Sequence, residues 1–109
     1  MKVILSNMCL SLVGMLNPEL GYHLEHRKNG FFAVRNNTPA PPDGHWRFIV
    51  LCAELAQNGL HISDIEVTNR ELFDALREAN LPSPAFLNWN NVETYHARDI
   101  LNLKTTFGL

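Results

Sequence analysis

Four polar side chains near the C-terminus have the types and spacing to read DNA. They lie three or four positions apart, as one side of a helix requires, and they are Asn88, Asn91, Tyr95 and Arg98. Asparagine can form hydrogen bonds with adenine edges in the major groove. Because these side chains avoid the apolar stripe of the same segment, a helix here would present them to a nucleic acid.

A second helix would have to precede this one, as in a helix-turn-helix motif. The stretch that begins at Leu72 and ends at Leu103 has that outline, with a turn at residues 80–82 and a cap at Ser83. Asn80 can adopt the left-handed backbone angle that such a turn needs. However, the second helix carries balanced charge, whereas phosphate contacts supply most of the affinity for DNA. We therefore interpret the stretch as ordinary packed helices and keep a DNA-binding transcriptional regulator as the alternative function.

The histidines and cysteines do not predict a metal site. His23 and His26 are three residues apart on a predicted strand, which directs them to opposite faces. Neither cysteine belongs to a C-x-x-C pair, and no H-E-x-x-H motif occurs. We therefore expect no metal and no cofactor.

Acid–base or nucleophilic catalysis is not favoured either. His23, Glu25 and Glu54 could act as acids or bases, but a solvated carboxylate is far commoner than a tuned one. The chain contains no G-x-S-x-G motif and no glycine-rich phosphate loop. We do not expect an enzyme, although the sequence leaves a small binding pocket open.

The elements that position these residues begin with a hairpin around Asn29-Gly30, a dipeptide that favours tight reversals. One register has a two-residue loop and mixes polar and apolar residues on both faces. The other has a three-residue loop, pairs Leu24 with Val34, and gathers apolar residues on one face. Because a half-buried hairpin requires such segregation, we expect the second register.

Two helices are predicted on either side of the hairpin. Apolar residues at helical spacing predict an N-terminal helix over residues 5–16. After a proline-rich connector, a second helix begins at His45 or Trp46 and runs to about Asn58. Its apolar residues occupy nearly all sides, so it should be central to the core or covered by a partner.

Two further helices are predicted in the C-terminal half. Residues 68–71 (Thr-Asn-Arg-Glu) form a capping box, and the helix that follows should run to about Asn80. A serine and a proline at residues 83–84 predict the start of the last helix. Residues 60–67 could form either a strand or a turn.

Composition places limits on the molecule as a whole. The 109 residues predict a single domain over residues 1–109. The formal charge of −2 does not predict strong attraction to nucleic acid or to an anionic membrane. Cys9 and Cys52 lie in apolar runs and are typical of buried free thiols. We therefore expect a cytoplasmic protein that does not bind membranes.

These elements predict an α+β fold: an N-terminal helix, a β-hairpin and then three helices packed as one small domain. The favoured function is that of a small cytosolic, non-catalytic interaction or regulatory protein. The central helix has more apolar surface than its neighbours easily cover, so we expect a protein partner or a homodimer. Phe48 and Leu55 are the candidate self-association residues. The partner and the biological process cannot be derived from the sequence.

Overall fold

The computed structural model describes residues 2–5, 20–27, 30–37, 41–57 and 62–106. In chain order, the elements are strands β1 (Lys2–Leu5), β2 (Tyr22–Arg27) and β3 (Gly30–Arg35), helix α1 (Gly44–Gln57), strand β4 (Ile62–Thr68), helix α2 (Asn69–Glu78), strand β5 (Thr94–His96) and helix α3 (Ala97–Thr106).

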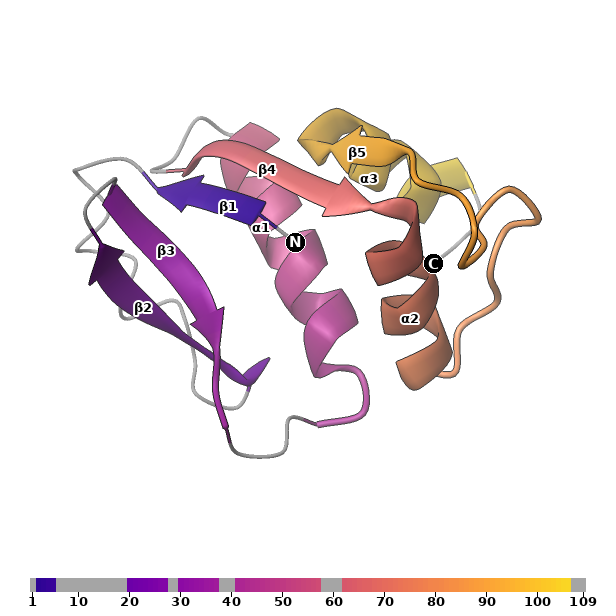
Figure 1. Ribbon diagram of the computed structural model, residues 1–109. Helices are drawn as coiled ribbons and strands as arrows, with labels where there is room; N and C mark the ends of the chain where they lie inside the picture. Colours follow the sequence, from indigo (N-terminus) through magenta and orange to yellow (C-terminus); the bar gives the residue numbers. More distant parts are fainter. Residues whose placement is uncertain (1, 6–19, 28–29, 38–40, 58–61, 107–109) are drawn as a thin grey trace.

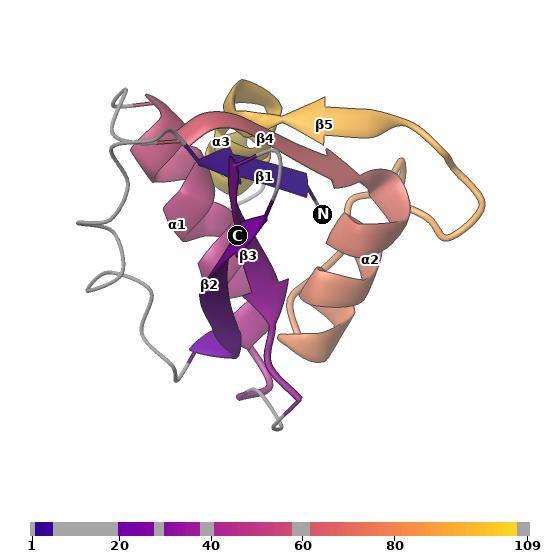
Figure 2. The same ribbon diagram turned by 60° about the vertical axis from the view of Figure 1, so that its left-hand side comes forward.

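The strands form one antiparallel sheet in the order β2-β3-β1-β4-β5. In Figure 1, α1 runs behind β1 and β4, and α2 continues from the end of β4. Turning the molecule shows α3 behind β4 as well (Figure 2). Helices α1 and α3 therefore cover one face of the sheet, and the core lies between them and β4.

The predicted central helix is confirmed, because α1 lies at the middle of the core. Its buried residues come from more than one side of the helix and include Trp46, Phe48, Ile49 and Cys52. Burial raises the pKa of the Cys52 thiol to about 12, so this free cysteine stays protonated. The other cysteine lies outside the described residues.

The predicted order of elements is wrong. The first described element is the strand β1, whereas an N-terminal helix over residues 5–16 was expected; residues 6–16 of that helix lie outside the described residues. The ambiguous segment before Thr68 is a strand, β4. A short apolar run such as that of residues 3–5 fits a buried strand and a helix equally well, so periodicity could not separate the two.

The hairpin is confirmed, but both registers considered for it are wrong. Tyr22 pairs with Arg35 and Leu24 with Ala33, which is one residue away from the expected pairing of Leu24 with Val34. The reason lies outside the hairpin. Tyr22 faces the core, where its ring stacks on that of Phe48 with centroids 3.9 Å apart. The expected register also turned Tyr22 inward; what differs is β3, where Ala33 packs against the core and Val34 pairs with the outward His23. Because alternate residues face opposite sides of a strand, this one-residue shift reverses the faces of β3.

The predicted last helix is also wrong in its first part. Residues 83–93 contain turns and no helix; the strand β5 follows, and α3 begins only at Ala97. Three asparagines in this segment accept or donate local backbone bonds, which compete with helix formation.

Helix α2 begins and ends as its sequence predicts. The Thr68 hydroxyl accepts from the Glu71 amide, and the Glu71 carboxylate accepts from the Thr68 amide in return. At the other end Asn80 has φ 56°, the left-handed conformation expected of it. The amides of Asn80 and Leu81 donate to Arg77 and Leu76, which is the bond pattern of a Schellman motif.

A partly buried pair of polar side chains joins the hairpin to the start of α1. The Tyr22 hydroxyl lies 2.8 Å from His45 Nδ1. Burial raises the pKa of Tyr22, which therefore keeps its proton. Burial lowers the pKa of His45; the nearby Arg35 lowers it further, while Glu78 opposes the shift. The imidazole is therefore neutral at pH 7.

Replacing Thr68 with alanine should lower the free energy of unfolding by about 1 kcal/mol, because the Glu71 amide loses its acceptor. Urea denaturation measures the change. Thr68→Ser is the matched control, since it keeps the hydroxyl and should retain most of the stability. Equal stability of the two variants would show that the cap contributes nothing.

The neutral His45 should make stability depend on pH. Its pKa in the folded protein lies below the usual 6.5, so the unfolded chain binds more protons as the pH falls through that value. The free energy of unfolding should therefore decrease from about pH 7 to about pH 5. In His45→Gln this decrease should be smaller, as denaturation at both pH values can measure. An identical decrease in both proteins would contradict the assignment.

Candidate functional site

A buried asparagine organises the irregular segment between α2 and β5. Asn69, the first residue of α2, is fully buried at 0% exposure. Its side-chain Nδ2 donates to the Tyr95 hydroxyl (2.8 Å) and to the Phe86 carbonyl (3.3 Å). Its Oδ1 accepts from the Asn88 amide (2.7 Å). Both N–H groups and the carbonyl oxygen are therefore satisfied, and one side chain holds three separate points of the chain.

The backbone of Asn69 adds a further bond across the same junction. Its amide donates to the Glu93 carbonyl at 2.8 Å. The Tyr95 hydroxyl, which accepts from Asn69, lies 3.3 Å from a Glu93 carboxylate oxygen and donates to it. Burial raises the pKa of Tyr95, and this keeps the donating proton in place. The end of the segment is thus tied to α2 through main chain and side chain together.

Local asparagine turns shape the rest of the segment. Asn88 Oδ1 accepts from the amides of Asn90 (3.0 Å) and Asn91 (2.9 Å). Asn91 Oδ1 accepts from the Glu93 amide at 3.0 Å. Such side-chain acceptors replace the missing backbone ladder. We call residues 81–93 the asparagine loop; it has a defined conformation without being a helix or strand.

The asparagine loop displays large apolar side chains to solvent. Within the described residues, the exposed large apolar side chains are Phe86 (42% exposed), Trp89 (47%) and Val92 (84%). Trp89 is held from one side by Arg70, whose guanidinium lies 4.3 Å from the ring centroid and whose Nε donates to the Trp89 carbonyl at 2.9 Å. We call Phe86, Trp89 and Val92 the loop surface. Figure 1 shows this loop as the orange segment that projects beside α2.

A shallow groove of about 210 Å³ adjoins the loop surface at Phe86. Its other walls come from β5 and α3 and include Tyr95, Leu103 and the carboxylate-bearing Asp99. Glu93 lies close by through its contact with Tyr95. The groove therefore combines an aromatic wall with acidic groups at its edge.

The residues predicted to read DNA lie in this region but do not share a helix. Asn88 and Asn91 belong to the asparagine loop, Tyr95 to β5, and the exposed Arg98 to α3. Three of them hold the loop together through the bonds described above. The interpretation of the stretch from Leu72 as a helix-turn-helix is wrong, because no helix lies between Glu78 and Ala97. The DNA-binding alternative loses its recognition element.

The residues predicted for self-association lie on α1. Phe48 is fully buried within the chain, so it offers no surface to a second subunit. Leu55 is half-buried against the core. On the same helix, Glu54 forms an ion pair with Lys104 of α3 at 3.0 Å.

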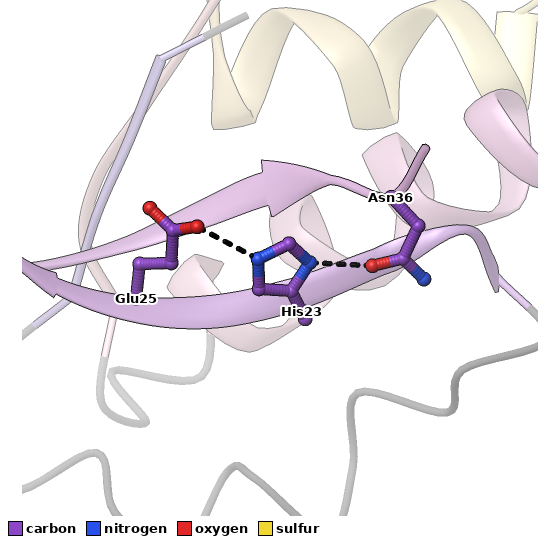
Figure 3. A network of polar contacts seen from close by, with 3 residues as sticks. All are labelled: His23, Glu25 and Asn36. Carbon is purple, nitrogen blue, oxygen red and sulfur yellow. Dashed lines mark hydrogen bonds and ion pairs between the residues drawn. The ribbon is translucent and has the colours of Figure 1, made fainter. Parts of the chain in front are cut away.

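The hairpin residues considered for acid–base chemistry form a clamp on the exposed side of β2 (Figure 3). His23 Nδ1 lies 2.5 Å from Asn36 Oδ1, and its Nε2 lies 2.9 Å from Glu25 Oε1. Both ring nitrogens therefore form hydrogen bonds within the chain. The clamp joins β2 to the residue that follows β3.

Sequence reasoning missed Asn69, the residue on which the loop depends. It lies inside the capping box, where an asparagine carries no special signal. Its role arises from partners 17 to 26 positions away in the chain. The density of asparagines from residue 88 to 91 was the available signal, and it pointed to a turn-rich loop.

Comparison with family models, curated proteins and solved structures finds no match to this chain. Within the described part of the chain, no group of three or more histidine, cysteine or acidic residues could hold a metal ion. In the same part, no helix combines the length and apolar character needed to cross a membrane. Function must therefore be argued from geometry alone.

Replacing Asn69 with alanine should lower the free energy of unfolding by about 2 kcal/mol or more, since buried groups at three positions lose their partner. Hydrogen exchange should also speed up at the Asn88 amide. Asn90→Ala, at an exposed position of the same loop, is the matched control and should leave both quantities nearly unchanged. Unaltered exchange at Asn88 in the Asn69 variant would contradict the central role of the buried amide.

Proposed function

We propose that this chain is a small, non-catalytic interaction domain of the cytosol that binds a protein partner through the loop surface. The observation that carries the proposal is the exposure of Phe86, Trp89 and Val92 on a loop held by buried hydrogen bonds. Exposed apolar clusters are typical of binding sites. Aromatic side chains supply much of the energy at protein interfaces.

The rigidity of the asparagine loop supports this proposal. A loop that is ordered before binding loses less conformational entropy when a partner docks. Asn69 and the local asparagine turns provide that order, and Arg70 restrains Trp89. Exposed apolar residues could be tolerated on a disordered tail without function, but here a buried polar network is used to hold them in place.

The groove beside Phe86 indicates the chemistry of the partner. An apolar side chain would fill the space between Phe86 and Leu103, while Asp99 at the wall favours a positive charge. We therefore propose a partner segment that carries an apolar residue next to lysine or arginine. The free, buried Cys52 thiol fits the reducing compartment in this proposal.

Selection from a random peptide library displayed on phage tests the proposal. The immobilised protein should enrich peptides that pair an apolar residue with a basic one. Val92→Asp should abolish the enrichment without loss of stability, because Val92 is largely exposed. Thr105→Asp, an equal change of charge at an exposed position of α3, is the control and should retain the enrichment.

Two results would overturn this assignment. One is enrichment of the same peptides by Val92→Asp, which would place binding elsewhere. The other is an absence of enriched peptides together with a dimer, seen in sedimentation velocity, that Val92→Asp dissociates; the occupant of the loop surface would then be a second copy of the chain.

A further inference from the structure

A polar cleft of about 340 Å³ lies on the other side of α2, away from the loop surface. The hairpin, the first turns of α1 and one flank of α2 form its walls. Figure 1 shows the hairpin and α2 on either side of the first turns of α1. The volume lies within the range of small-molecule sites.

The cleft carries opposite charges on opposite walls. Arg35 lies on the hairpin side, and Asp74 and Glu78 lie on the α2 side. The two carboxylates are four residues apart and therefore share one flank of the helix. Glu71 also lines the cleft, but its carboxylate is engaged in the cap with Thr68. The floor includes apolar groups of Ile49, Ala33 and Ala75.

Two buried polar atoms in these walls have no hydrogen-bond partner within the described residues: His45 Nε2 and Asp74 Oδ1. Glu78 Oε2 lies 3.5 Å from His45 Nε2, and Arg77 lies 3.2 Å from Asp74 Oδ1. Arg77 and Asp74 are close enough for charge attraction, whereas His45 is neutral, and neither pair completes a hydrogen bond. Because these two atoms are buried, a ligand in the cleft would contact the exposed side chains of Arg35 and Glu78 and not these atoms.

The neighbours of His45 determine which of its two ring nitrogens carries the proton. The imidazole is neutral, and the carboxylate of Glu78 beside Nε2 can only accept. We assign the proton to Nε2, so that Nδ1 accepts from the Tyr22 hydroxyl. The Nε2–H group faces Glu78, and the cleft offers a ligand a cation at Arg35 and carboxylate acceptors on the α2 side.

We propose that this cleft binds a free α-amino acid with an apolar side chain. Arg35 binds its carboxylate, Asp74 and Glu78 bind its ammonium group, and Ile49 contacts its side chain. The positive charge of a simple amine would be repelled by Arg35, and the negative charge of a simple carboxylate would be repelled by Glu78. Only a ligand with both charges matches both walls.

Chemical-shift titration with leucine, leucinamide and N-acetyl-leucine tests the charge requirement. Leucine should shift the resonances of residues that line the cleft, and it should bind about tenfold or more tightly than either analogue, each of which lacks one charge. Equal binding of the three compounds would overturn the proposal, as would an absence of shifts with leucine at about 10 mM.

Two variants test which wall of the cleft binds each charge of the amino acid. In Arg35→Gln the preference for leucine over leucinamide should disappear, and in Glu78→Gln the preference over N-acetyl-leucine should disappear. Arg47→Gln, which removes an exposed arginine paired with Asp43, is the control and should bind leucine as the parent protein does. Retained preferences in both test variants would refute the assignment. Val92→Asp should bind leucine normally, so this test is independent of the loop surface.

Discussion

The buried amide of Asn69 is the constraint on which the C-terminal half of this structure depends. An asparagine side chain has two donors and one carbonyl acceptor, and burial makes every unpaired one costly. The chain satisfies them by bringing Phe86, Asn88 and Tyr95 to the start of α2. The path of the asparagine loop and the position of β5 at the edge of the sheet follow from that requirement.

Helix α2 connects the two proposed sites without belonging wholly to either. Its first residue holds the asparagine loop, and Arg70, one residue later, restrains Trp89. Its flank presents Asp74 and Glu78 to the cleft, while Leu72 and Leu76 lie in the core. The three roles fall on different sides of one helix. A stable capping box and a Schellman motif fix the ends of this helix, so both sites rest on a rigid element.

The sequence pointed to the region of the candidate site, but the role it predicted for the residues there differs from the role that the structure shows. Asn88, Asn91 and Tyr95 were predicted to face outward and read DNA, and they do lie in or beside the asparagine loop. Their hydrogen bonds go to the chain itself, because no helix forms there to turn them outward. Asparagine is equally suited to base edges and to backbone amides. Residue type and spacing could not distinguish these two uses of asparagine. The cleft could not be predicted from any local sequence pattern, because its walls come from separate elements.

The sequence by itself determined the features that depend on neighbours within a few residues. These include the capping box at Thr68, the left-handed Asn80, the extent of α1 and the existence of the hairpin. Tertiary structure decided the hairpin register, the strands β1 and β5, and the placement of Arg35 and the carboxylates of α2 around one cleft. The physical reason is the range of the interactions. Caps and turns are satisfied within one or two turns of chain, whereas the burial of Tyr22 against Phe48, or of Asn69 beneath Tyr95, exists only once distant segments have met.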